Sequence, residues 1–104
     1  MFGNNEEVIG KKNEEGKARW DLLDMQFTGE VVNVLTAGAE KYGANNWQNV
    51  EDAENRYFAA LMRHIVAYRN GEDNDPEDGL PHLAHAACNL MFLQHFIDEN
   101  TVEE

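Results

Sequence analysis

The stretch GLPHLAHAACNLMFLQHF, residues 79–96, decides the fold of this chain. It opens with a glycine, has a proline two residues later, and then continues without another glycine or proline. Proline is tolerated in the first turn of a helix, because the N–H that it lacks has no helical partner there. The pattern therefore predicts a helix that follows Gly79, has Pro81 in its first turn and ends at about Glu99.

One face of this expected helix is polar at its beginning and apolar further on. His82, His85 and Asn89 are spaced i, i+3 and i+7 and so share a face, and Phe92 and Phe96 continue the same line. A buried polar group without a partner costs roughly 1–3 kcal/mol. We therefore expect a site with hydrogen-bonding partners of its own, at the polar end of a core-facing stripe.

An acidic segment immediately upstream offers such partners. Residues 71–79 read GEDNDPEDG and place five carboxylates within residues 72–78. The segment does not fit an EF-hand, because counting from Asp73 the sixth residue is Asp78 instead of glycine and the twelfth is Ala84 instead of glutamate. Two interpretations stay open, namely a solvated turn between helices and a loop that binds a cation.

The rest of the sequence predicts further helices and no strands. Apolar residues at helical spacing indicate one helix that starts between residues 24 and 28 and ends near Gly43, and another from about Asp52, a candidate N-cap, to Asn70. A short helix near residues 18–25, a loop at 44–50 and a flexible or extended arm at 1–15 complete the organisation. We expect an all-α bundle of three long helices, a single domain over residues 16–104.

The apolar faces of these helices are wide for so short a chain. The second helix has an apolar face of Phe58, Leu61, Met62, Ile65 and Tyr68. A different face carries Arg56, Ala59, Ala60, Arg63, Ala67 and Asn70. A single domain of 104 residues buries only a modest core by itself. Symmetric association is the commonest way to complete such burial, so we expect a homodimer or homotetramer.

Composition limits the class of function. A formal net charge of -12 argues against binding to nucleic acid or to an anionic membrane. The single cysteine, the lack of a long apolar run and the lack of a signal peptide predict a cytoplasmic protein. A phosphorylated substrate stays compatible with the acidic charge, because polyphosphates bring divalent cations, which carboxylates bind. Simple solubility explains much of the charge equally well.

Several motifs together resemble a known enzyme family. They are, in chain order, GKARWDLL at 16–23, GAEKYG at 38–43, NW at 46–47, RH at 63–64, GEDNDPE at 71–77 and GLPHLAHAACN at 79–89. In this order and over residues 16 to about 94 they are similar to the phage-type dATP/dGTP diphosphohydrolases. The resemblance implies an all-α fold related to the MazG-like pyrophosphohydrolases. It also implies metal-dependent hydrolysis of a purine deoxynucleoside triphosphate to the monophosphate and pyrophosphate.

The resemblance does not carry over a complete set of metal ligands. MazG-like enzymes have Glu-x-x-Glu and Glu-x-x-Asp motifs on helices, whereas the matching pair here, Glu72 and Asp75, lies in the acidic segment. We expect these two to bind Mg²⁺ or Mn²⁺, with Glu40 and Glu77 as weaker candidates.

Other residues are assigned to the substrate and to proton transfer. Lys17, Arg19, Lys41 and Arg63 are expected to hold phosphates. His64, His82 and His85 are expected to orient phosphates or water and to transfer protons near neutral pH. Asn46 and Trp47 are the candidates for contact with the base, and Asn89 for fixing the histidines or the sugar. Trp47 serves equally well as core filler.

Two other classes of function remain open on the sequence. A different metal-dependent phosphohydrolase, such as an HD-type enzyme, is disfavoured because the sequence has no His-Asp dipeptide. A zinc site on His82 and His85 would need a third ligand, and Cys88 has a suitable spacing. The second class is a non-catalytic acidic helical module that binds a protein partner. Nucleotide turnover separates that module from an enzyme.

Overall fold

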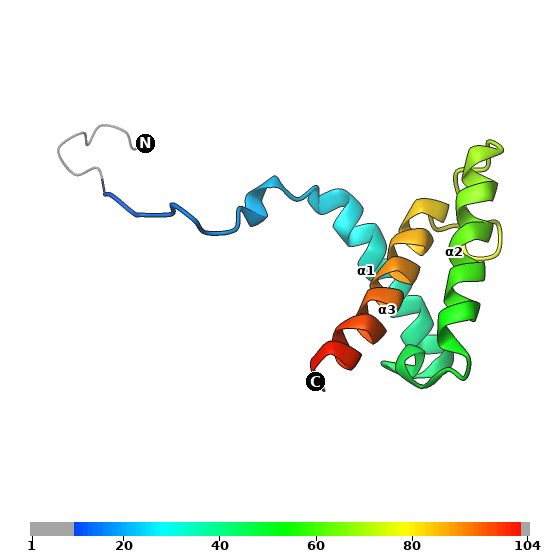
Figure 1. The fold of residues 1–104 in the computed structure, drawn as a ribbon. Coiled ribbons are helices and arrows are strands. Elements are labelled where there is room, and N and C mark those ends of the chain that lie inside the picture. Colours follow the sequence, from blue (N-terminus) through cyan, green and yellow to red (C-terminus); the bar gives the residue numbers. More distant parts are fainter. Residues whose placement is uncertain (1–9, 103–104) are drawn as a thin grey trace.

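The computed structural model describes residues 10–102, and every named element of secondary structure within them is a helix. The elements are a 3₁₀ turn η2 (Trp20–Leu22), helix α1 (Met25–Tyr42), a 3₁₀ turn η3 (Asn46–Asn49), and helices α2 (Ala53–Arg69) and α3 (His82–Val102) (Figure 1). The predicted all-α fold with three long helices is confirmed. Residues 1–9 of the expected arm lie outside the described part. None of the described helices is long and apolar enough to cross a membrane.

Helix α3 is the centre of the bundle, since α2 packs along it and α1 packs against it as well. Small side chains at Ala84 and Ala86 are buried, which lets the neighbouring helices approach closely. Cys88 is also buried, and its thiol lies 3.6 Å from the carbonyl oxygen of Val31 in α1. Burial raises the pKa of this thiol to about 11. The fully buried core of the single described chain is therefore small and belongs to α3.

The ends of α1 follow local signals in the sequence. The Asp24 carboxylate accepts a hydrogen bond from the Gln26 N–H at 3.0 Å and so caps the first turn. At the other end Gly43 has a φ of 98° and donates its N–H to the Ala39 carbonyl oxygen. Such a φ favours glycine, which has no Cβ. Both predicted helix ends are confirmed.

The ends of α2 and α3 differ slightly from expectation. Asp52 is the N-cap residue of α2, as predicted, but its carboxylate accepts from the Asn55 side chain at 3.1 Å instead of capping a backbone N–H. Pro81 precedes α3, whose first residue is His82, and the Pro81 carbonyl oxygen accepts from the backbone N–H of Ala84 and His85. The proline therefore ends the acidic segment and starts the helical hydrogen bonding.

The connection between α1 and α2 is more ordered than a loop. Residues 46–49 form η3, where the Trp47 ring stacks on Phe92 of α3 with a centroid separation of 4.6 Å. The Tyr57 hydroxyl of α2 donates to the Trp47 carbonyl oxygen at 2.8 Å. Trp47 thereby ties the connection to the later half of α3, as core filler would.

Helix α2 points an unexpected face toward α3. The partly buried side chains along α2 include Tyr57, Ala60, Leu61, His64 and Ala67, whereas most of the predicted apolar face is exposed. The exposed apolar positions at successive helical spacings form what we call the outer stripe of α2: Phe58, Met62, Ile65 and Val66. Of the predicted apolar face, only Leu61 is partly buried in the single chain.

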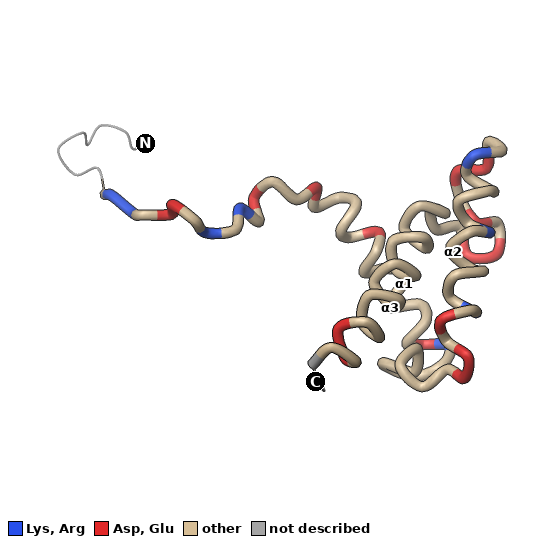
Figure 2. Tube along the Cα trace, in the orientation of Figure 1, with Lys and Arg blue, Asp and Glu red and all other residues tan. Residues whose placement is uncertain are grey.

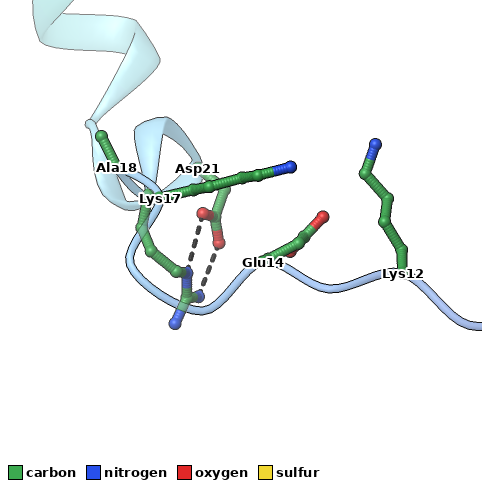
Figure 3. A pocket seen from close by; sticks show the side chains of 6 residues that line it. Lys12, Glu14, Lys17, Ala18 and Asp21 are labelled. Carbon is green, nitrogen blue, oxygen red and sulfur yellow. Dashed lines mark hydrogen bonds and ion pairs between the residues drawn. The ribbon is translucent and has the colours of Figure 1, made fainter.

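Residues 10–24, called the arm below, run away from the bundle on the side of α1 (Figure 1). This extended segment continues past residue 15 to the start of α1 and contains η2. A shallow hollow on the arm is lined by Lys12, Glu14, Lys17, Ala18, Arg19 and Asp21 (Figure 3). The Arg19 guanidinium donates two hydrogen bonds to the Asp21 carboxylate, at 2.7 and 3.0 Å (Figure 3). These contacts are all local to the arm.

Candidate metal and phosphate site

The acidic segment between α2 and α3 is closed by hydrogen bonds. The backbone N–H of Asp75 donates to the Leu80 carbonyl oxygen at 2.8 Å, and that of His82 donates to the Asp73 carbonyl oxygen at 2.9 Å. Two carboxylates also accept from backbone N–H groups, Asp75 from Glu77 and Asp78 from Leu80, each at 2.9 Å. The segment is thus a folded and largely exposed loop held against the start of α3, which is compatible with both a solvated turn and a loop that binds a cation.

Three histidines meet beside this loop, one from α2 and two from α3. The Nδ1 atoms of His64 and His82 lie 2.8 Å apart. The His64 ring also stacks on His85, with centroids 4.4 Å apart and the planes within 5°. His82 is buried. The three imidazoles predicted as catalytic are therefore brought together by the packing of α2 on α3.

Three carboxylates of the loop surround the imidazoles. Glu72 Oε1 lies 2.7 Å from His82 Nε2. Asp78 Oδ2 lies 2.9 Å from His85 Nε2, but outside hydrogen-bonding geometry, which leaves that nitrogen without a hydrogen-bond partner. Asp75 belongs to two ligand groups: ligand atoms of His64, Asp75 and His82 lie within 4.8 Å of one another, as do those of Asp75, Asp78 and His85. We call the five residues of these two ligand groups the histidine–aspartate cluster.

Proton positions in the His64–His82 pair follow from Glu72. An ionised Glu72 only accepts, so His82 Nε2 carries the proton and a neutral His82 has a bare Nδ1. Two bare nitrogens 2.8 Å apart repel, so either a proton or a cation must lie between His82 Nδ1 and His64 Nδ1. The bare Nδ1 of a neutral His82 therefore offers its lone pair to the proton or cation that lies between the two rings.

Burial and charge both act on His64. Burial lowers its pKa below the ordinary value of 6.5, and the neighbouring His85 and His82 lower it further, while Asp75 opposes the shift. The neutral imidazole is accordingly the favoured form at neutral pH. A neutral imidazole is also the form that ligates a metal ion.

The cluster fits a divalent transition metal ion on two observations. The 2.8 Å separation of the two Nδ1 atoms is close to the roughly 3.0 Å between neighbouring octahedral ligands that are each about 2.1 Å from one ion, and it is shorter than the roughly 3.4 Å between tetrahedral ligands. A metal-bound histidine commonly donates its other N–H to a carboxylate, which is the arrangement of His82 and Glu72. Mixed imidazole and carboxylate donors suit Mn²⁺ or Zn²⁺ better than Mg²⁺, which prefers oxygen ligands.

The remaining predicted metal ligands lie outside the two ligand groups. Glu72 contacts the potential ligand His82, so it would orient that ligand instead of binding the ion itself. Glu77 is exposed, and its carboxylate lies 3.8 Å from the Lys41 ammonium. Glu40 is exposed on α1. The loop thus divides its carboxylates: Asp75 and Asp78 lie in the cluster, Glu72 supports it, and Glu77 brings a lysine close to the loop.

The predicted phosphate-binding residues fall into two places. Lys41 reaches the loop through Glu77, and Arg63 is an exposed neighbour of His64 on α2. Lys17 and Arg19 belong to the arm, away from the bundle. Of these four residues, only Arg63 lies on an element that builds the cluster, and Lys41 at the end of α1 approaches the loop through Glu77. Asn89 is buried and donates its side-chain N–H to the His85 carbonyl oxygen at 2.9 Å.

The predicted base-binding pair is set apart from the histidines. Asn46 is exposed in η3, and Trp47 lines a shallow groove with Met91, Gln94, His95 and Asp98. At 100° per residue, these α3 positions lie roughly 160° around the helix from His82 and His85. The groove is thus on another side of α3 from the cluster.

Asp78 is the cluster residue that the sequence interpretation missed. The Glu-x-x-Asp pattern ends at Asp75 and therefore leaves Asp78 out. A usable signal was present, because Asp78 follows Asp75 by three residues in a loop bounded by Gly71 and Gly79, both of which have positive φ in the structure. A loop held this tightly turns back on itself, so its later carboxylate also faces the helix that follows.

Comparison with known proteins identifies relatives of this chain. The family model described as dATP/dGTP diphosphohydrolase, N-terminal, matches residues 7–104. A protein of Salmonella phage PMBT28 named dATP/dGTP diphosphohydrolase is 44% identical over 86 residues, which cover 83% of this chain and 29% of that protein. The chain thus spans less than a third of the length of this curated relative. No solved structure matches it. With a family model that matches almost its whole length, the chain belongs to the dATP/dGTP diphosphohydrolase N-terminal family.

Proposed function

We propose that this chain hydrolyses purine deoxynucleoside triphosphates, dGTP and dATP, to the monophosphate and pyrophosphate, with the histidine–aspartate cluster as its active site. The observation that carries the proposal is the convergence of three histidines and two aspartates from α2, the loop and α3 in a member of this family. The name of the phage relative supports the substrate class. Such activity would shape the deoxynucleotide pool in the cytoplasm of a bacterial or phage-infected cell.

The reaction sets three requirements for the residues. Water adds to a phosphorus of the α–β anhydride, the bridging P–O bond breaks, and a base accepts the proton that water loses. The negative charge on the phosphates must also be balanced. His85 suits the role of base, because its Nε2 lacks a hydrogen-bond partner and Asp78 lies beside it. Lys41 and Arg63 suit the role of phosphate ligands, being exposed cations on elements next to the cluster.

A divalent cation completes the proposal. His64, His82 and Asp75 would hold it, and Glu72 would keep His82 in the tautomer with a bare Nδ1. The cation would supply charge neutralisation of the triphosphate and activation of water. Of the two ions expected from the sequence, the donor set favours Mn²⁺ over Mg²⁺. The low pKa of His64 supports binding at neutral pH, because fewer protons compete for its lone pair.

Specificity for purines rests on the relative's name, and Asn46 and Trp47 stay our candidates for contact with the base. Trp47 has one ring face against Phe92, so only its other face and its edge are open to the groove beside Met91 and Gln94. Since the groove lies on another side of α3 from the histidines, packing is the first role to expect of Trp47.

The decisive experiment is a turnover screen of the four canonical dNTPs and of GTP and ATP, each with Mn²⁺ and with Mg²⁺, with products identified by chromatography. We expect dGTP and dATP to yield the monophosphate and pyrophosphate, faster with Mn²⁺. His85→Gln serves as the inactive control and should fold normally. Release of orthophosphate would contradict the bond assignment, equal turnover of dCTP and dTTP would contradict purine specificity, and inactivity toward every nucleotide would favour the interaction module.

A further inference from the structure

The end of α1 carries an exposed aromatic ring beside the loop of the candidate site. Tyr42, the last residue of α1, is 63% exposed. The Lys41 ammonium lies 5.2 Å from the centroid of the Tyr42 ring and 3.8 Å from the Glu77 carboxylate. The neighbouring Tyr42, Glu77 and Asp78 raise the pKa of Lys41. A ring, an ammonium and the carboxylate loop therefore follow one another in this order.

This order matches the order of groups in a nucleoside triphosphate bound with its metal ion. Such a molecule has its base at one end and, at the other, the charged phosphates that take the cation. The loop holds five carboxylates in residues 72–78 (Figure 2), so a phosphate chain beside it needs the cation of the cluster and a side chain such as Lys41. A base directed away from the cluster past Lys41 would meet the Tyr42 ring, and every base has a face that stacks on such a ring.

Other aromatic side chains are placed less favourably for the base. Trp47 has one face against Phe92 and lines a groove on another side of α3 from the cluster. Tyr57 is partly buried and also contacts Phe92. Trp20 belongs to the arm, which runs away from the bundle (Figure 1). Tyr68, 43% exposed near the end of α2, is the other exposed tyrosine of the described residues and serves as the comparison below.

The turn after Tyr42 brings an amide to the same end of α1. Gly43 and Asn45 have φ values of 98° and 63°, both in the left-handed region, which glycine and asparagine adopt more readily than other residues. The backbone N–H of Asn46 donates to the Gly43 carbonyl oxygen at 3.2 Å. Asn46 is exposed, and a side-chain amide both donates to and accepts from the edge of a base. Asn46 is therefore held close to Tyr42 through the backbone.

We propose that Tyr42 is the stacking platform for the purine base of the substrate, with Asn46 beside it at the edge of the base. The inference rests on the proposed function, since the phosphates must be held at the cluster. It assigns the stacking expected of Trp47 to a ring at the end of α1. Stacking on a base far from the reacting phosphorus contributes equally before and during the reaction, so it should act on KM and leave kcat unchanged.

Kinetics with dGTP and Mn²⁺ test the platform with matched variants. Tyr42→Leu removes the ring and should raise KM by roughly tenfold while kcat stays within about twofold. Tyr42→Phe keeps the ring, and Tyr68→Leu removes the other exposed tyrosine, so both should have the wild-type KM. All three variants should keep wild-type helicity by circular dichroism, because both side chains are exposed. An unchanged KM in Tyr42→Leu, or an equal rise in Tyr42→Phe, would overturn the platform.

Equilibrium binding separates this inference from the proposed reaction. The analogue α,β-methylene-dGTP keeps the base but lacks the bridging oxygen, and inorganic tripolyphosphate lacks the base. In calorimetric titrations with Mn²⁺, Tyr42→Leu should bind the analogue about tenfold more weakly than wild type and tripolyphosphate equally well. Unchanged affinity for the analogue would overturn the platform alone. Analogue binding that depends on Tyr42 without any turnover of dGTP would overturn the reaction alone, and no binding of the analogue would overturn both.

Discussion

The two halves of α3 use the same side of one helix for different purposes. In the first half, His82 and His85 contact His64 and the carboxylates of the loop. In the second half, Phe92 stacks on Trp47 and contacts Tyr57. The first half also contains the fully buried residues of the described chain, such as Ala84 and Cys88, whereas the aromatic groups of the second half are partly buried and anchor η3 and α2. On this side of the helix the candidate site and the aromatic anchor are separate, and substitutions should distinguish them.

The largest effect is expected for Asp75→Asn in the first half. Asp75 belongs to both ligand groups, and removal of its charge should reduce kcat by roughly 10²–10³-fold and weaken Mn²⁺ binding. The amide oxygen of the replacement side chain can still accept from the Glu77 N–H, so the loop should keep its shape. Turnover and calorimetric titration with Mn²⁺ measure the two effects. Asp73→Asn, which removes the same charge from the same loop outside the cluster, should behave like wild type.

A large effect on stability, instead of catalysis, is expected for Trp47→Ala in the second half. Trp47 is partly buried, so loss of the ring stacked on Phe92 should lower the free energy of unfolding by about 2 kcal/mol, less than the roughly 3–5 kcal/mol for a fully buried aromatic side chain. Urea unfolding followed by circular dichroism measures this loss. The exposed Ile97→Ala, in the same half of α3, should change it by less than about 0.5 kcal/mol. If Trp47→Ala kept full stability and instead raised KM for dGTP, Trp47 would be a base-binding residue.

A smaller effect on catalysis is expected for Glu72→Gln. Glu72 contacts His82 Nε2 and is outside both ligand groups, so its replacement should reduce metal affinity and activity by about 10–100-fold. Equilibrium Mn²⁺ titration distinguishes this from loss of a direct ligand. Glu77→Gln is the matched control in the same loop, because Glu77 lies against Lys41. A loss as large as that of Asp75→Asn would place Glu72 on the cation itself.

The smallest effect concerns Cys88 in the middle of α3. Its pKa is raised from 9.0 to about 11, so the folded protein favours the neutral thiol. Folding stability from this group should be complete below about pH 9 and should decrease as pH rises toward 11, because the unfolded thiol ionises first. At pH 8, alkylation by iodoacetamide should be slow in the folded protein and fast in urea. Equal rates would mean that the α1–α3 contact opens readily.

Local sequence signals predicted where the helices begin and end. They did not predict which face of α2 packs against α3. Asp24, Gly43 and Asp52 mark helix ends through contacts within a few residues, so the neighbouring sequence is enough to predict these ends. The choice of the buried face of α2 depends on α3. Hydrophobicity favoured Phe58, Met62 and Ile65 as the core face, yet α3 packs against the side with His64 and small residues.

The arrangement of the candidate site could likewise be predicted only in part. The i, i+3 spacing of His82 and His85 was readable, and so was the carboxylate loop beside them. The sequence could not show that Asp78 faces His85, since this depends on how the loop closes through Asp75 and Leu80. It also could not show that the arm leaves Lys17 and Arg19 away from the cluster of their own chain.

The closed loop between α2 and α3 has a consequence for folding. Every residue of the cluster falls between His64 and His85, a contiguous segment of two helices and their connection. By contrast, the contact of Cys88 with Val31 joins positions 57 residues apart. Short-range contacts close sooner because less chain entropy is lost. The α2–loop–α3 hairpin should therefore assemble its histidines early in folding, before α1 docks.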